Sequence, residues 1–228
     1  MVAATGSTEK KVEIPAGRHM LNGYLRLPEN PCGVIVFAHG SGSGRFSPRN
    51  QFVSHMLEEK AFATLLLDLL DEEEAYDRHN IFNIELLAAR LLCAADWVRQ
   101  EQSIKNLPIG YFGASTGAGA ALVAAAHKPE SIFAIVSRGG RPDLAADFLN
   151  GVKAPTLLIV GGRDDEVIQL NEKAMHSLHC QKQLVIVPGA THLFEERGTL
   201  QEAALLARDW FIQHLPASLT LENTDTSQ

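Results

Sequence analysis

A serine at the centre of the pentapeptide Gly113–Gly117 (GASTG) has the surroundings of an activated nucleophile. The pattern G-x-S-x-G is typical of a nucleophile elbow, in which the chain turns sharply from a strand into a helix and exposes the serine hydroxyl. The apolar run 109–112 before Ser115 and the alanine-rich run 118–126 after it match the strand and the helix that such a turn requires.

A histidine and an aspartate later in the chain supply the partners that a catalytic serine needs. A serine hydroxyl becomes a good nucleophile when an imidazole accepts its proton, and an acid must orient that imidazole. His192 follows the apolar run 183–187, and Asp164 follows the apolar run 156–160. Both are therefore expected on loops at the carboxyl edge of a sheet, beside Ser115. The order serine, aspartate, histidine is the one that accompanies this kind of elbow.

The tetrahedral intermediate of such a reaction needs two backbone N–H donors for its oxyanion. The residue after the nucleophile, Thr116, is expected to supply one of them. The second is expected from the glycine-rich loop 39–44, where we place it at Ser41, with Gly40 as the alternative.

Four arginines lie near the loops that are expected at the carboxyl edge, namely Arg45, Arg49, Arg138 and Arg141. They are candidates for binding an anionic substrate, and the alternative is that they are surface charges or braces for the loops. The residues His176, His179 and Cys180 have a spacing that would suit metal ligands on a helix. No further ligand set accompanies them, so we expect a solvated helix end and no metal.

The alternation of short apolar runs with longer helical patterns predicts an α/β fold, with a mostly parallel eight-stranded sheet covered by helices on both faces. The first two strands are expected to form an antiparallel hairpin at the sheet edge. The predicted strands are 11–14, 21–27, 33–39, 63–69, 108–114, 132–137, 156–161 and 183–188. The predicted helices are 48–60, 84–101, 116–128, 142–149, 167–178 and 200–214.

The composition bounds the remaining possibilities. The chain has 228 residues and a formal net charge of −7, which favours one domain and disfavours nucleic acid or membranes as partners. We expect a flexible N-terminus over 1–10, a single domain over 11–216 and a flexible tail over 217–228. No apolar run approaches the roughly 20 residues that span a bilayer, and no signal peptide is evident. We expect a cytoplasmic monomer or homodimer that acts on a small molecule without a cofactor.

The loop after the third predicted strand, the elbow, the segment Gly161–Val167 and the segment Gly189–His192 together resemble the α/β-hydrolase superfamily, in its dienelactone hydrolase-like branch without a large lid. The resemblance covers about residues 11–215. It implies Asp164, not Asp165, as the acid. Authentic dienelactone hydrolases carry a cysteine nucleophile and a glutamate in the early loop, whereas this chain has Ser115 and no acid over 33–47. These departures favour a carboxylic ester over a dienelactone. Only about fifteen residues, 138–152, separate the sixth and seventh predicted strands, which leaves no room for a large cap and favours a small ester, lactone or thioester, cleaved through an acyl-enzyme.

Three other functions fit parts of the sequence less well. A dinucleotide-dependent reductase would carry its glycine motif on the first strand, and here the motif follows more than a hundred residues. A non-catalytic binding module on the same fold would not need an intact triad. An acyltransferase or peptidase would use the same three residues, and the sequence leaves this alternative open.

Overall fold

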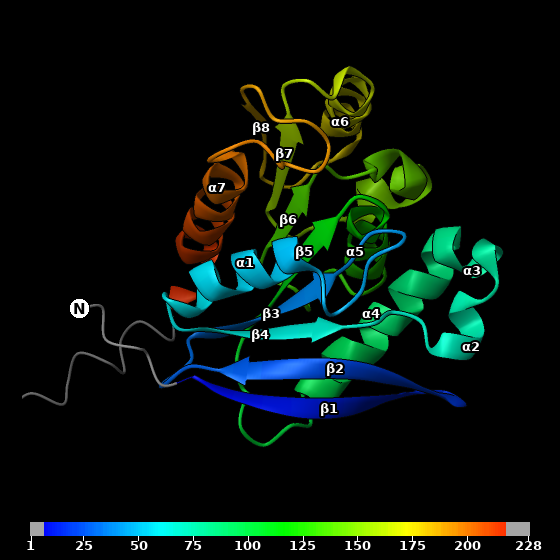
Figure 1. Ribbon diagram of the computed structural model, residues 1–228, viewed down its shortest axis with the longest axis vertical. Helices are drawn as coiled ribbons and strands as arrows, with labels where there is room; N and C mark the ends of the chain where they lie inside the picture. Colours follow the sequence, from blue (N-terminus) through cyan, green and yellow to red (C-terminus); the bar gives the residue numbers. More distant parts are fainter. Residues whose placement is uncertain (1–6, 218–228) are drawn as a thin grey trace, which may run out of the picture.

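Eight strands form one sheet in the order β1-β2-β4-β3-β5-β6-β7-β8, and the computed structural model describes residues 7–217 (Figure 1). The strands are β1 (Thr8–Ala16), β2 (His19–Leu27), β3 (Gly33–Ala38), β4 (Phe62–Leu67), β5 (Ile109–Ala114), β6 (Ile135–Arg138), β7 (Thr156–Gly161) and β8 (Lys182–Val187). Strand β2 pairs antiparallel with both β1 and β4, and the remaining neighbours are parallel. The predicted α/β class and hairpin are confirmed.

Alternating side chains send each central strand's apolar residues to two separate clusters. On β3, Val34 and Val36 belong to one cluster, and Ile35 and Phe37 belong to the other. The first cluster also contains residues of α4 (Ile84–Val98), α5 (Thr116–His127) and α6 (Asp165–Ser177). The second contains residues of α1 (Pro48–Glu58) and α7 (Thr199–His214). Both faces of the sheet are therefore covered by helices, as Figure 1 shows.

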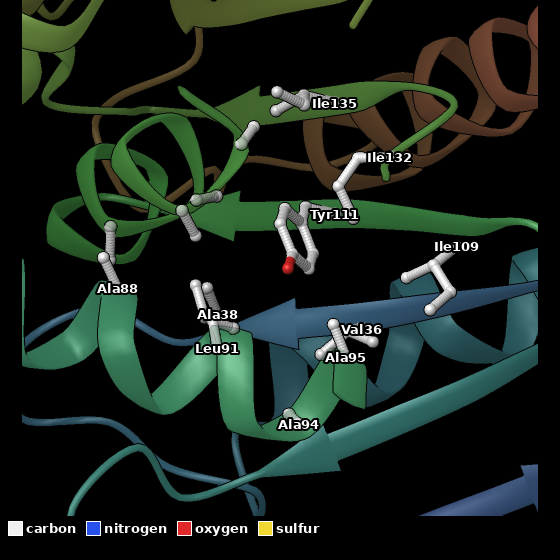
Figure 2. Packing of buried hydrophobic residues seen from close by; sticks show 14 of the residues in the cluster. Val36, Ala38, Ala88, Leu91, Ala94, Ala95, Ile109, Tyr111, Ile132 and Ile135 are labelled. Atoms are coloured by element: carbon white, nitrogen blue, oxygen red, sulfur yellow. The ribbon is translucent and has the colours of Figure 1, made fainter. Parts of the chain in front are cut away.

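The contact between α4 and the sheet depends on small residues of that helix. Figure 2 shows Tyr111 of β5 pointing toward α4, near Leu91 and beside Val36 of β3. Ala88, Ala94 and Ala95 are at most 1% exposed, and their small side chains let the helix lie close to the strands.

Among the described residues, no helix is long and apolar enough to span a membrane.

The structure differs from the predicted elements at the first strand, at the sixth strand, which begins at Ile135 and not at 132, and at the helix predicted over 142–149. Strand β1 begins at Thr8, because residues 8–10 pair with Leu25–Leu27 of β2, so the predicted flexible N-terminus is wrong for these residues. Residues 1–6 and 218–228 lie outside the described part of the chain. The predicted helix at 142–149 is the 3₁₀ helix η1 (Pro142–Gly151), with non-helical dihedral angles at Ala145.

Two short helices, α2 (Glu72–Ala75) and α3 (Arg78–Phe82), were not predicted. Each is shorter than two turns, so neither shows an apolar period that the sequence could reveal. Their beginnings are nevertheless marked, because Asp71 accepts a hydrogen bond from the Glu74 N–H and Asp77 accepts one from the His79 N–H. Side-chain caps of this kind satisfy N–H groups that a helix leaves unpaired at its first turn.

Candidate active site

The chain turns from β5 into α5 at Ser115, whose φ and ψ angles are 51° and −121°. A positive φ is unusual for a residue other than glycine and stores strain in the backbone. Close backbone contacts hold the turn in place. A Cβ atom at Gly117 would lie 2.2 Å from the Ala38 carbonyl oxygen, and one at Gly113 would lie 2.4 Å from Ala118 Cα. Glycine is therefore required on both sides of the serine, as the elbow motif predicts.

The structure brings Ser115, His192 and Asp164 together in one hydrogen-bonded series. The distance from His192 Nε2 to Ser115 Oγ is 3.3 Å, and the distance from His192 Nδ1 to Asp164 Oδ2 is 2.6 Å. Because the carboxylate can only accept, Nδ1 carries the proton in neutral His192 and Nε2 is left to accept from the serine. This arrangement can activate the serine hydroxyl as a nucleophile.

Ser115, Asp164 and His192 each follow the carboxyl end of a strand, at the same edge of the sheet. Ser115 follows β5, Asp164 lies three residues beyond β7, and His192 lies five residues beyond β8. Since β5, β6, β7 and β8 are parallel, their carboxyl ends coincide. Asp165, the alternative acid, is the first residue of α6 and is exposed, and the structure assigns it no contact with His192.

The two predicted oxyanion donors lie next to each other. Thr116 is the first residue of α5, where backbone N–H groups have no partner within the helix. The Ser41 N–H donates to the Thr116 hydroxyl at 2.9 Å, so this hydroxyl occupies the donor that a substrate oxygen would need. The assignment of both donors stays a prediction. Gly40 packs against the serine instead, since a Cβ there would lie 3.0 Å from Ser115 Cβ.

The half-buried His39 fixes the loop that carries Ser41. Its Nδ1 donates to the Gly40 carbonyl oxygen at 3.0 Å, and its Nε2 accepts from the Leu69 N–H at 3.0 Å. Burial lowers the pKa of His39, which keeps the ring neutral and able to accept. No role was predicted for His39, although a polar side chain directly after a fully buried strand is a signal that could have indicated one.

Two of the four predicted arginines brace loops instead of facing the serine. Arg45 forms an ion pair with Asp68, which also accepts from the Arg45 backbone N–H at 2.7 Å. Arg141 donates twice to Asp143 at 2.8 Å, and this pairing raises the pKa of Arg141. Their charges are therefore already compensated by protein carboxylates.

The other two arginines line a cavity of about 180 Å3 beside the serine, which we call the arginine pocket. Its lining includes Ser41, Arg49, Ser115, Arg138, His192 and Leu193. Arg49 reaches Glu195 at 3.4 Å in an exposed ion pair. Arg138 is 5% exposed, its guanidinium carbon lies 5.6 Å from the Phe194 ring centre, and its Nε is buried without a hydrogen-bond partner among residues 7–217.

A second cavity of about 310 Å3, which we call the apolar pocket, adjoins the arginine pocket at the loop 39–44. It shares Ser41 with the arginine pocket and is lined further by Thr116, Leu70, Ala75, Ile81 and Leu87. The segment with α2 and α3 forms part of its wall. This cavity was not predicted because the two helices were not predicted.

The residues considered as metal ligands do not form one cluster. His176 Nδ1 bonds to the Glu172 carbonyl oxygen at 2.9 Å, whereas Cys180 donates to Thr156 at 3.7 Å. In the described part of the chain, the group of possible ligands that does meet is His19, Asp71 and Glu74. Arg90 forms an ion pair with that glutamate, so its charge is compensated without a cation.

Comparisons with solved structures agree with this fold. Dienelactone hydrolase from Anabaena variabilis is 52% identical, with a TM-score of 0.90, and the match covers 92% of this chain and 99% of that one. Est1E from Butyrivibrio proteoclasticus has a TM-score of 0.77 at 17% identity, over 90% of this chain and 98% of its own, which shows likeness of fold.

Sequence comparisons place the chain in a family and match it to longer proteins. Two curated relatives from Mycobacterium tuberculosis, strains CDC 1551 / Oshkosh and H37Rv, are 56% identical over 207 residues, and each bears the name "Putative phosphoribosyl transferase". The match covers 91% of this chain and 47% of each relative, so the chain spans about half their length. The family model described as the Dienelactone hydrolase family matches residues 21–213. The chain therefore belongs to the dienelactone hydrolase family of α/β-hydrolases.

Proposed function

We propose that the chain is a serine hydrolase that cleaves a small carboxylic ester, lactone or thioester through an acyl-enzyme intermediate. The observation that carries this proposal is the hydrogen-bonded series from Ser115 through His192 to Asp164. The distance of 3.3 Å to the serine oxygen is long for a hydrogen bond, as is common in catalytic sites without substrate. Membership of a hydrolase family supports the same reaction class.

In the proposed reaction, Ser115 Oγ attacks the carbonyl carbon while His192 Nε2 takes the hydroxyl proton. The Asp164 carboxylate stabilises the imidazolium through its hydrogen bond to Nδ1. The carbonyl oxygen becomes an oxyanion, which accepts from the Thr116 N–H and from the Ser41 N–H once it has displaced the Thr116 hydroxyl. His192 then gives its proton to the leaving oxygen. Water attacks the acyl-enzyme by the same steps and releases the acid.

The buried Arg138 supports a substrate that carries a carboxylate. A charged group that is nine-tenths buried and has no compensating partner is costly for the folded protein. Burial lowers its pKa to about 10, which leaves the guanidinium charged at neutral pH. Because this residue lines the same pocket as Ser115 and His192, a carboxylate bound there would supply the missing partner within reach of the reacting atoms.

Acyl transfer would use the same three residues and would differ only in the acceptor that replaces water. Hydrolysis of an ester in buffer without an added acceptor therefore separates the two reactions. The name of the curated relatives describes a phosphoribosyl transfer, and that name applies to proteins about twice as long as the matched region. We keep ester hydrolysis as the proposed function because the serine, histidine and aspartate of the site fit that chemistry.

The test is the hydrolysis of 4-nitrophenyl acetate by matched pairs of variants. Ser115→Ala is expected to lower kcat/KM by about 10⁴-fold or more, and Asp164→Asn by about 10³- to 10⁴-fold, because the imidazole loses its orientation. The controls are Ser103→Ala and Asp165→Asn, which change exposed residues outside the site. Full activity in folded Ser115→Ala, or equal losses in Asp164→Asn and Asp165→Asn, would contradict the proposal.

A further inference from the structure

The apolar pocket adjoins the arginine pocket at the loop 39–44, and of these two cavities only the arginine pocket is lined by Ser115. The two share Gly40, Ser41 and Ser43, and the Ser41 N–H donates to the hydroxyl of Thr116, which lines the apolar pocket. His192 lines only the arginine pocket of these two. A carbonyl oxygen that displaces the Thr116 hydroxyl would therefore have one cavity on either side.

The position of His192 determines which pocket receives the alcohol part of the ester and which receives the acyl part. His192 Nε2 must return its proton to the leaving oxygen, so the alcohol part lies on the side of His192, in the arginine pocket. The acyl part then extends past Ser41 and Thr116. Its place is the apolar pocket, whose volume of about 310 Å3 is at the lower end of the roughly 300–1,000 Å3 typical of ligand sites.

Charges around the apolar pocket oppose an anionic acyl group. Its polar rim includes Asp68, Asp71 and Glu72, and the one arginine of its lining, Arg45, is already paired with Asp68. The Glu74 backbone N–H and His19 hold the pKa of Asp71 below its ordinary value, so this carboxylate stays ionised at neutral pH. A second carboxylate placed beside these groups would be repelled.

From these observations we propose that the apolar pocket is an acyl subsite that selects an uncharged acyl chain of several carbons, so that any carboxylate of the substrate belongs to its alcohol part. This inference rests on the proposed ester hydrolysis. It names Leu70, Ala75, Ile81 and Leu87 as the residues that contact the acyl chain. In the reaction the acyl chain stays in this pocket while the bond to the leaving oxygen breaks and the bond to Ser115 Oγ forms.

The first arm of the test varies the acyl group of 4-nitrophenyl esters on the wild-type protein. Each methylene that leaves water contributes about 0.8 kcal/mol, so kcat/KM is expected to rise by about 10-fold from the butyrate to the hexanoate. The hemisuccinate, which ends in a carboxylate, is expected to react about 10-fold more slowly than the uncharged pentanoate. A flat or falling series, or a preference for the hemisuccinate, would overturn the subsite.

The second arm of the test fills part of the apolar pocket with an aromatic side chain. Ala75 is exposed to solvent at the end of α2, so Ala75→Phe can add a ring to the pocket without disturbing the core. The variant is expected to abolish the gain from butyrate to hexanoate and to lower the rate with the acetate much less. The control is Ala146→Phe on η1, which changes an exposed alanine outside both cavities and is expected to keep the gain. Equal losses for all chain lengths in Ala75→Phe would contradict the assignment.

The failure of this inference differs from a failure of the proposed function. If the acetate is hydrolysed through Ser115 while acyl length has no effect, the hydrolase proposal stands and the acyl subsite is wrong. If no ester is hydrolysed and Ser115 is not reactive in the folded protein, both proposals are wrong.

Discussion

Two buried arginines, Arg90 and Arg138, differ in what their guanidinium groups contact. Arg90 is 9% exposed and Arg138 is 5% exposed, so both charges are removed from water. Arg90 donates to the Glu74 carboxylate and, at 2.8 Å, to the Ala16 carbonyl oxygen. Arg138 has no ion-pair partner among residues 7–217, and its Nε is buried without a hydrogen-bond partner. The same residue type at the same depth is thus paired with a carboxylate in one region and left without one in the other.

The contacts of Arg90 hold together elements that form the apolar pocket. Arg90 lies on α4, Glu74 on α2 and Ala16 at the end of β1. His19 adds a further contact, with its Nε2 3.6 Å from a Glu74 carboxylate oxygen. The region around Arg90 is therefore a structural ion-pair cluster, whereas the region around Arg138 is a cavity beside a nucleophile.

The largest expected effect on stability comes from breaking the compensated pair. Arg90→Met leaves the Glu74 carboxylate buried without its partner, which is expected to lower the free energy of unfolding by about 3–5 kcal/mol. Urea denaturation followed by circular dichroism measures this change. The control, Arg208→Met, removes an arginine that pairs with Asp209 on the surface of α7, and it is expected to cost less than about 1 kcal/mol. A loss below about 1 kcal/mol in Arg90→Met would contradict the comparison.

Removing the uncompensated arginine should have the opposite effect on stability and a selective effect on activity. Arg138→Met is expected to raise the free energy of unfolding by about 0.5–2 kcal/mol, since it removes a buried unpaired charge. Burial lowers the pKa of Arg138 in the folded protein to about 10, so its charged form is less stable there than in the unfolded chain, and this cost is fully present below about pH 10.

The same variant tests the role of Arg138 in substrate binding. We compare butyrate esters of 4-hydroxy-3-nitrobenzoate and of its uncharged amide. Wild type is expected to prefer the acid in kcat/KM by about 10- to 100-fold, and Arg138→Met is expected to abolish most of this preference. Arg208→Met should retain it. If both variants keep the preference of the wild type, Arg138 does not bind the substrate carboxylate.

The smallest expected effect concerns the other arginine of the pocket. Glu195→Gln removes the exposed ion-pair partner of Arg49 and is expected to raise the preference for the anionic ester by less than about 5-fold, because such pairs contribute at most about 1 kcal/mol. Steady-state kinetics with the acid and amide esters measure the ratio. A fall in that ratio would show that Glu195 helps to bind the substrate.

The catalytic residues around Arg138 could be predicted from the sequence, whereas the pairing of the arginines could not. The elbow, Asp164 and His192 could be predicted because each follows an apolar run, and parallel strands bring such positions to one edge of the sheet. The sequence could not separate the four arginines, because whether a guanidinium is paired depends on tertiary contacts. Arg138 directly follows the predicted strand 132–137, which indicates a position at the edge of the sheet but not whether its guanidinium has a partner.

The cluster around Arg90 could not be predicted for a related reason. It joins β1, α2 and α4, and the ion pair between Arg90 and Glu74 spans 16 residues. The short helix α2 shows no apolar period, and only the cap at Asp71 indicates where it begins. The apolar pocket depends on this segment, so the sequence could predict the nucleophile but not the cavity beside it.

The central claim is that Ser115 is an activated nucleophile, and covalent labelling with a fluorophosphonate tests it most directly. The wild-type protein and Ser115→Ala are treated with the probe at neutral pH, and intact and peptide mass spectrometry locate the adduct. We predict one phosphonyl group on Ser115 in wild type, none in Ser115→Ala and strongly slowed labelling in Asp164→Asn. A folded wild-type protein that stays unlabelled, or that is labelled equally in Ser115→Ala, would contradict the account.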